Sequence, residues 1–145
     1  RILDRRYDGG NSLLAAAIVA EYFRDQLWEH CDRTNAALKE KRDAVFEELE
    51  RGVGDICTWS RPVGGLFIWV TLPDGTDMNK LSRMAAERGV RYAEGSGFHI
   101  RNVSVCNIRL AFGYTSMEDI RDGIPQLCDC IRVACDHKAI TSPAA

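Results

Sequence analysis

The segment Leu66-Phe67-Ile68-Trp69-Val70-Thr71-Leu72 decides the fold of this chain of 145 residues. It is rich in β-branched and aromatic residues, which favour a strand. The stretch before it, Arg61-Pro62-Val63-Gly64-Gly65, is incompatible with a helix or a central strand. Pro73-Asp74-Gly75, after it, is typical of a turn. The sequence therefore predicts one strand over residues 66–72, bounded on both sides.

Further elements are predicted around this strand. They are short strands at 56–60, 90–93 and 106–112, a loop at 94–97, and amphipathic helices at 77–88 and from Ser116 onward. Thr76 or Asp77 caps the first helix, and Ser116 with Asp119 forms a variant capping box for the second. Some consecutive strands are connected directly and others through a helix. We therefore expect an α/β (α+β) fold, a small mixed or antiparallel sheet with helices packed on one face.

Pro125 lies inside the apolar stripe of the last predicted helix. A proline in a helix interior removes a backbone hydrogen bond and clashes with the preceding turn, at a cost of about 3 kcal/mol. The sequence therefore leaves two alternatives, a kinked helix or a new helix beginning at Pro125.

Two helices are predicted upstream of the sheet. The first begins at Asn11 or Ser12, ends near Arg24, and is apolar nearly all round over Leu13–Ala20, so it requires a buried environment. The second runs from Gln26 to Arg51, about 39 Å, long enough to bridge two structural units. The chain offers few partners for the first helix, and it begins without a methionine. We therefore expect it to be part of a longer protein, called the parent protein below.

Composition disfavours several classes of function. Hydrophobic residues make up 46% and charged residues 28%, and 19 Lys+Arg against 21 Asp+Glu leave a net charge of −2, as in a soluble globular domain. No basic excess indicates nucleic acid or an anionic membrane surface, and the longest apolar run is far shorter than the roughly 20 residues of a membrane span. Six scattered cysteines lack the paired spacing of a zinc site and are expected to be reduced core residues, which favours the cytoplasm.

Arg109 is the residue most indicative of chemistry, because it interrupts the apolar strand Cys106-Asn107-Ile108-Arg109-Leu110-Ala111-Phe112. A guanidinium there can offer a bidentate fork to a carboxylate. The alternative is an outward-facing arginine on a half-buried strand. Gly64-Gly65 permits either a close approach to a ligand or an ordinary turn. No nucleophile–base pair is visible.

The aromatic residues Trp59, Phe67 and Trp69 are interpreted as core rather than as a stacking platform, because no basic residues interleave with them.

Several motifs resemble class I/II, fold-type I, pyridoxal-phosphate-dependent aminotransferases. Residues 62–73 resemble the signature P-x-G-G-x-F-x-W-x-x-L-P of that family. Gly89-Val90 with Glu94-Gly95-Ser96-Gly97-Phe98 resembles its G-V…P-G-x-x-F, with Glu94 where the family has proline, and Asn107–Phe112 resembles its x-x-R-L-x-F strand. Gly9-Gly10-Asn11-Ser12 and Lys41-Arg42-Asp43-Ala44 are similar to the 2-aminoadipate and kynurenine aminotransferase branch.

This resemblance implies an organisation for the chain. Residues 1–24 would be the end of a large cofactor-binding domain, residues 25–52 a long bridging helix, residues 53–137 the C-terminal small domain, and residues 138–145 a disordered tail. It also implies a parent protein that is a homodimer, with the large domain as a partner of this segment.

The resemblance further implies roles for individual residues. Arg109 corresponds to the arginine that holds the substrate α-carboxylate, and Gly64, Gly65 and Phe98 would line the mouth of the cleft. The Ser-x-x-Lys segment with the Schiff-base lysine is absent from the chain, as are the other cofactor-binding residues, and Lys39, Lys41 and Lys80 have the wrong context. Catalytic, cofactor-binding and metal-binding residues are therefore expected to be absent, with pyridoxal 5′-phosphate bound in the parent protein but not by this fragment alone.

The implied function is an aminotransferase of amino acid metabolism that moves an amino group between an amino acid and a 2-oxo acid, this fragment being inactive by itself. A different reaction on the same fold, such as elimination or decarboxylation, is left open. The alternatives of another class are the effector-sensing, aminotransferase-like domain of a winged-helix transcription regulator, and a free-standing interaction module. A basic helix-turn-helix upstream would identify the regulator.

Overall fold

The computed structural model of the chain describes residues 12–99 and 105–135. The chain divides into two compact units, residues 1–37 and residues 38–145. The elements are α1 (Leu13–Val53), β1 (Thr58–Trp59), β2 (Phe67–Thr71), α2 (Met78–Glu87), β3 (Ala93–Glu94), the short 3₁₀ helix η2 (Gly95–Phe98), β4 (Asn107–Ala111) and α3 (Met117–Cys135). The tail predicted to be disordered, 138–145, and the first part of the segment 1–24 lie outside the described residues.

The first helix differs from the prediction of two helices with a break near residue 25. A single helix, α1, runs from Leu13 to Val53. The interval from Leu13 to Arg51 contains neither glycine nor proline, so no residue in it imposes an end on the helix. The change of apolar pattern near residue 25 therefore does not mark the end of a helix.

The four strands form one antiparallel sheet in the order β1-β2-β4-β3. The pairing of β2 with β4 is the longest and joins Phe67 to Ala111, Trp69 to Arg109 and Thr71 to Asn107. The expected small sheet is confirmed, and its described pairs are all antiparallel. The strand predicted at 90–93 is instead Ala93–Glu94, because β3 pairs with β4 only at Arg109 and Ile108.

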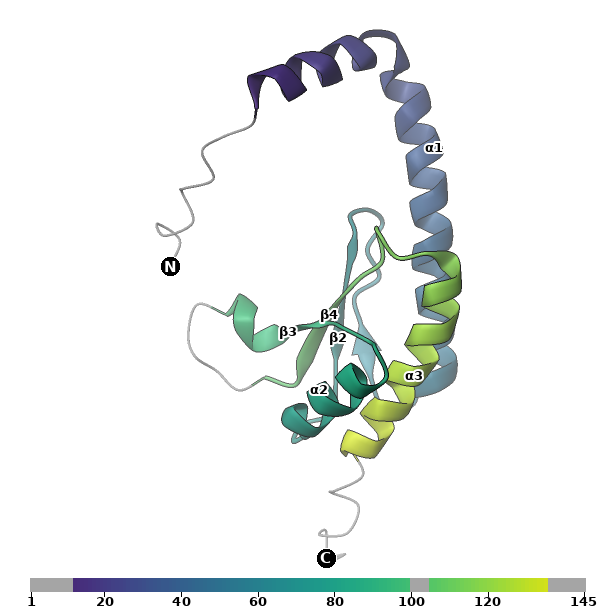
Figure 1. Cartoon of the computed structure of the whole chain (residues 1–145). Coiled ribbons are helices and arrows are strands. Elements are labelled where there is room, and N and C mark those ends of the chain that lie inside the picture. The colour runs from purple at the N-terminus through teal and green to yellow at the C-terminus, as the bar shows by residue number, and fades with distance from the viewer. Residues whose placement is uncertain (1–11, 100–104, 136–145) are drawn as a thin grey trace, which may run out of the picture. The chain divides into compact units, whose positions relative to one another are not determined.

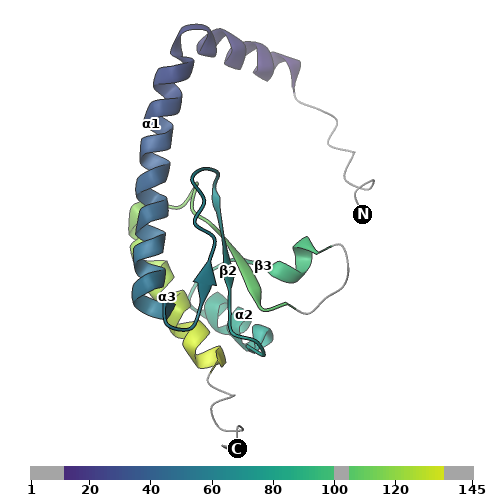
Figure 2. The same ribbon diagram turned by 180° about the vertical axis from the view of Figure 1, so that it is seen from behind.

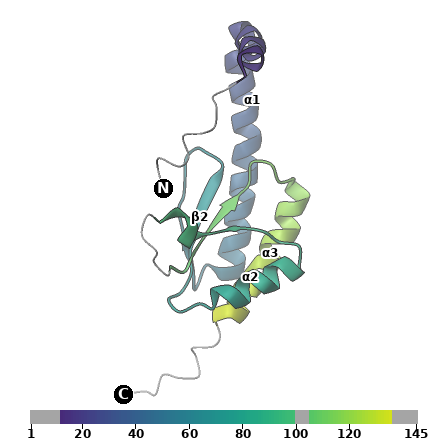
Figure 3. The same ribbon diagram turned by 60° about the vertical axis from the view of Figure 1, so that its left-hand side comes forward.

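The hydrophobic core lies between one face of the sheet and the helices. Buried side chains alternate along β2 and β4, namely Ile68, Val70, Ile108 and Leu110. They join buried residues of the C-terminal part of α1, of α2 and of α3 in one cluster. Figures 1, 2 and 3 show these helix segments on the same side of the sheet. The predicted arrangement of helices on one face is therefore confirmed.

The ends of the two later helices follow the predicted caps. The Asp77 carboxylate accepts a hydrogen bond from the backbone N–H of Lys80 at 2.9 Å, and the Ser116 hydroxyl accepts one from that of Asp119 at 3.0 Å.

Pro125 lies inside the single helix α3, so the alternative of a new helix start at Pro125 is wrong. Burial of Leu127, Cys130 and Ile131 in the core stabilises the helix beyond the proline and offsets the lost hydrogen bond.

A buried carboxylate ties α1 to α3. Glu48 is almost fully buried, and its carboxylate accepts hydrogen bonds from Arg51 and from Arg121, each at 2.8 Å. A buried charge without such partners would be strongly destabilising. The C-terminal half of α1 is therefore part of the sheet-containing unit.

Two negative findings apply to residues 12–99 and 105–135. No helix in these ranges is both long enough and apolar enough to cross a membrane. They also contain no group of three or more His, Cys, Asp and Glu side chains arranged to hold a metal ion.

The buried thiols give the fold a predicted pH dependence. Burial raises the pKa of Cys57 to about 12 and that of Cys128 to about 11, above the usual value near 9.0. Between these values the folded thiols keep protons that the unfolded chain has lost. The stability they contribute is therefore complete below about pH 9 and is lost as the pH rises toward 11 and 12.

We expect the free energy of unfolding, measured with urea, to fall between about pH 7.5 and pH 10.5. The double variant Cys57→Ala/Cys128→Ala should show a shallower fall over the same interval, since other alkaline groups remain in place. An equal slope in both proteins would contradict the contribution of these thiols.

Candidate functional site

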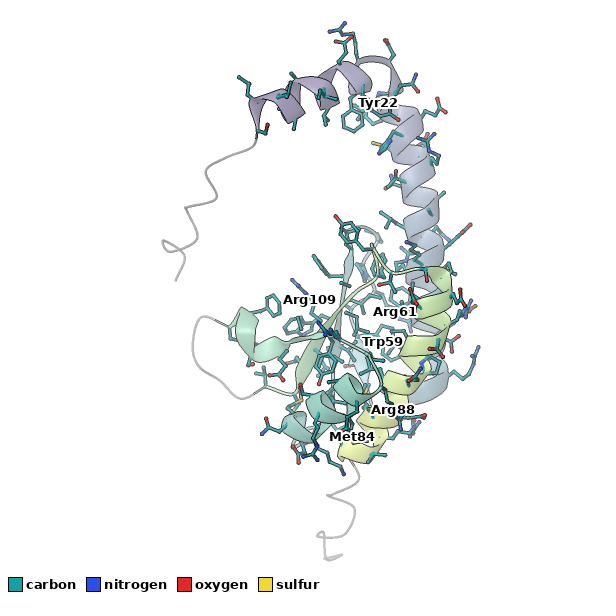
Figure 4. All side chains as sticks on the ribbon, in the orientation of Figure 1. Tyr22, Trp59, Arg61, Met84, Arg88 and Arg109 are labelled. Carbon is teal, nitrogen blue, oxygen red and sulfur yellow. The ribbon has the colours of Figure 1, made fainter. Side chains whose placement is uncertain are left out.

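The face of the sheet away from the helices carries a cationic side chain among aromatic ones. Because side chains alternate along a strand, Arg109 points opposite to the buried Ile108 and Leu110. Trp69 lies directly across from it in the ladder, and Phe67 lies diagonally across on the same face. Figure 4 shows Arg109 on the side of the sheet that faces η2.

The guanidinium of Arg109 lies over two aromatic rings. Its Cζ atom is 4.0 Å from the ring centroid of Phe67 and 4.4 Å from that of Phe98. The ring of Phe98 also meets that of Trp69 edge-on, with centroids 5.8 Å apart. Such contacts place the guanidinium charge against the negative face of each ring.

The donors of Arg109 lack partners in the described part of the chain. Its Nε atom is buried and makes no hydrogen bond, and no ion pair to Arg109 is found among residues 12–99 and 105–135. A buried donor without a partner costs about 1–3 kcal/mol. A carboxylate from outside these residues can accept two parallel N–H bonds from the same guanidinium. The site is therefore suited to bind a carboxylate.

Two of the four predicted site residues, Arg109 and Phe98, are in direct contact. The close approach of η2 to β4 allows this, because a Cβ on Gly95 would lie 2.7 Å from the Cβ of Asn107. The sequence thus places glycine where the turn bearing Phe98 meets the strand bearing Arg109. The predicted loop at 94–97 is in fact this 3₁₀ turn.

The other two predicted residues, Gly64 and Gly65, precede β2 and are not brought against Arg109. Gly65 has a φ of 86°, which favours glycine, and a Cβ at either position would meet nothing within 4 Å. The turn interpretation is therefore supported within this chain, and their contact with a ligand remains a prediction.

Phe67 and Trp69 were missed as site residues, because all three aromatic residues were assigned to the core. Phe67 is 46% exposed on the open face, whereas Trp59 packs against the core from β1. The ladder explains the difference, since Trp59 pairs with the buried Val70. Alternation along 66–72 placed Phe67 and Trp69 on one face, but the side taken by Trp59 depended on the register of a second strand.

Two cavities of the sheet-containing unit lie away from Arg109. One of about 440 Å³ is lined by residues that include Arg88, Phe112 and Ile120, and one of about 540 Å³ by residues that include Thr71, Asp74 and Asn107. Neither includes Arg109.

The described residues do not fit a pyridoxal phosphate site. The three described lysines are held elsewhere: Lys39 pairs with Asp43 at 2.8 Å, Lys41 donates to the Gly113 carbonyl at 3.1 Å, and Lys80 donates to the Val133 carbonyl at 2.8 Å. Each lies on a helix rather than on the open face of the sheet.

Comparisons with known proteins agree with the predicted resemblance. The family model described as aspartate amino-transferase matches residues 17–142. Aromatic-amino-acid aminotransferase 1 of Thermococcus litoralis is 35% identical over 104 residues, which cover 72% of this chain and 25% of that protein. An uncharacterized HTH-type transcriptional regulator of Bacillus subtilis, YdfD, is 30% identical over 121 residues, covering 83% of this chain and 25% of the regulator.

Solved structures show the same fold. The α-aminoadipate aminotransferase LysN of Thermus thermophilus, solved with N-(5′-phosphopyridoxyl)-L-leucine, superimposes with a TM-score of 0.76 and 27% identity. The match covers 81% of this chain and 30% of that one, so the chain spans less than a third of the length of these relatives. The prediction of the C-terminal portion of a fold-type I aminotransferase is confirmed. The chain belongs to the aspartate amino-transferase family.

Proposed function

We propose that this chain is the substrate-carboxylate-binding portion of a pyridoxal-phosphate-dependent aminotransferase, which moves an amino group between an amino acid and a 2-oxo acid. The observation that supports this most is Arg109, a guanidinium on the open face of the sheet with aromatic rings beneath it and a buried Nε without a partner. Membership of the aspartate amino-transferase family supports the class of reaction.

In the proposed reaction this chain orients the substrate. Arg109 binds the α-carboxylate through two N–H donors, which fixes the position of the Cα–H bond relative to groups that the rest of the parent protein provides. Pyridoxal phosphate, when bound in the parent protein, supplies the stabilisation of the carbanion that proton removal leaves. The exposed rings of Phe67 and Phe98 exclude water from one side of the ion pair, which strengthens it.

The parent protein is further proposed to be a cytoplasmic homodimer of amino acid metabolism, with residues 1–24 belonging to its large domain. Exposed apolar side chains at the start of α1, including Leu13, Leu14 and Ile18, support a covering partner outside this chain. The proposed roles of Gly64 and Gly65 at the mouth of the cleft also require that partner. No nucleic acid is proposed to bind this segment.

A transaminase assay of the purified parent protein tests the proposal. With pyridoxal phosphate, a panel of amino acids and a 2-oxo acid acceptor, we expect turnover of amino acids that carry an α-carboxylate. Absence of turnover with every donor, in a protein that binds the cofactor, would contradict the transaminase function.

The fragment itself should not behave as the enzyme. When the 145-residue chain is mixed with pyridoxal phosphate and reduced with borohydride, we expect no stoichiometric labelling of one lysine, because each described lysine is exposed to solvent or bonded away from Arg109. Peptide mass spectrometry measures the labelling, and the parent protein is the positive control. Full labelling of a single lysine in the fragment would show that the chain holds the cofactor after all.

The second candidate is the effector-sensing domain of a winged-helix transcription regulator. The likeness to YdfD of Bacillus subtilis supports it. In such a protein Arg109 would bind the carboxylate of an effector that is not converted, rather than that of a substrate. A mobility-shift assay of the parent protein with DNA upstream of its own gene distinguishes the two functions. DNA binding whose affinity changes when an amino acid is added favours the regulator.

A further inference from the structure

Of the two aromatic rings that contact the Arg109 guanidinium in the described part of the chain, the ring of Phe67 is the nearer. The Cζ–centroid distance of 4.0 Å is shorter than that to Phe98, and well below the 5.5–5.7 Å distances of the other arginine–aromatic pairs in the described part of the chain. We propose that Phe67 is a positioning residue, which holds the guanidinium in the plane in which its N–H edge binds the substrate carboxylate. This inference rests on the proposed role of Arg109.

The position of Phe67 is set by the backbone. Phe67 and Arg109 lie on β2 and β4, which pair over five consecutive residues, so the diagonal relation of the two side chains is fixed by the ladder. On the other neighbour of Arg109, β3 places Ala93, a small residue that offers no face for the guanidinium. The Arg109 side chain is therefore supported from the β2 side.

The contact is unlike ordinary core packing. Phe67 is 46% exposed and does not belong to the buried cluster between the sheet and the helices. Its ring lies 4.0 Å from the Arg109 Cζ, within the range of a cation–π contact, and a guanidinium is weakly hydrated enough to be held there. Without this support a long arginine side chain retains several rotamers, and ordering one of them on binding costs affinity.

Phe98 makes a second contact but a less constrained one. It belongs to a 3₁₀ turn of four residues, and its ring rests on Trp69 as well as on Arg109. Phe67 is held by a paired strand and Phe98 by this short turn, so we assign the permanent positioning role to Phe67 alone.

The test compares four variants of the parent protein loaded with its cofactor, the first being Arg109→Ala, which removes the guanidinium. Phe67→Leu removes the ring face and keeps an apolar side chain, and Phe67→Tyr keeps the ring. Phe46→Leu is the matched control, because the Phe46 ring also supports arginines, Arg42 at 5.7 Å and Arg61 at 5.5 Å, away from the open face. Calorimetry measures binding of 3-phenylpropanoate and of its neutral amide, 3-phenylpropanamide, and a steady-state assay gives kcat and KM for an amino acid.

For Phe67→Leu we expect about a tenfold increase in the Kd of 3-phenylpropanoate, with little change for the amide, and a rise in KM larger than the fall in kcat. Phe67→Tyr should restore values close to those of the unsubstituted protein, and Phe46→Leu should leave both ligands unaffected. A purely structural role would weaken the acid and the amide alike.

The outcomes separate this inference from the proposed function. If Arg109→Ala abolishes the preference for the acid over the amide but Phe67→Leu does not, Arg109 binds the carboxylate and Phe67 does not position it. If Arg109→Ala leaves the preference intact, or the unsubstituted protein binds neither ligand, the carboxylate site itself is refuted. Equal losses in Phe67→Leu and Phe67→Tyr would also overturn the positioning role.

Discussion

Arg109→Ala in the parent protein is expected to lower kcat/KM for amino acids by roughly 100- to 1,000-fold, at about 1.4 kcal/mol for each factor of ten. The lost interaction is the proposed bidentate ion pair in the closed cleft of the parent protein, where such a pair would be much stronger than on a surface. The fold should persist, because Arg109 points away from the buried cluster. Steady-state kinetics and circular dichroism of the variant measure the two effects.

Amines that lack a carboxylate provide the control for this variant. They do not use the guanidinium, so their kcat/KM should change by far less than that of the corresponding amino acids. Arg109→Lys keeps the charge but loses the planar fork, and should fall between the two. Equal losses for amines and amino acids, or an unfolded variant, would show that Arg109 is structural and does not bind the substrate carboxylate.

Leu49→Ala is expected to reduce the free energy of unfolding of the chain by about 2–5 kcal/mol. Leu49 is 0% exposed and belongs to the cluster between α1, the sheet and the other two helices. Removing its branched end leaves a cavity among strands and helices that cannot close around it, in addition to the lost burial of apolar surface. Urea unfolding followed by circular dichroism measures the change.

Leu13→Ala is the matched control, since it makes the same substitution in the same helix at a residue that is 85% exposed. In the 145-residue chain it should change the free energy of unfolding by less than about 0.5 kcal/mol. In the parent protein the proposed large domain would cover Leu13, and the same substitution should then be destabilising. A small effect of Leu49→Ala would contradict the position of α1 against the sheet.

Local signals predicted much of the fold. The cap at Asp77 and the capping box at Ser116 depend on side chains that bond to a backbone only three residues away, and both are present. The strand 66–72 was defined by its own composition and by the turn residues beside it. The boundary near residue 25 was predicted wrongly. A change of apolar pattern reflects what each part of a helix contacts, whereas a helix ends at residues such as glycine or proline that interrupt its backbone hydrogen bonds.

Non-local contacts were harder to predict. The sequence left open whether Pro125 kinks α3 or begins a new helix, and burial of the following turn against the core supports one helix through it. The assignment of Phe67, Trp69 and Trp59 to one core face was wrong for two of the three. Their faces follow from strand pairing, which joins segments that the sequence alone does not align.

For the site itself, the sequence by itself determined that Arg109 points away from Ile108 and Leu110, since alternation along one strand is a property of the extended backbone. Its motifs also determined the family. Only the tertiary structure decided that the rings of Phe67 and Phe98 lie under the guanidinium. The physical reason is that these residues come from different segments, and a slip of one residue in the pairing of β2 with β4 would have turned Phe67 to the opposite face.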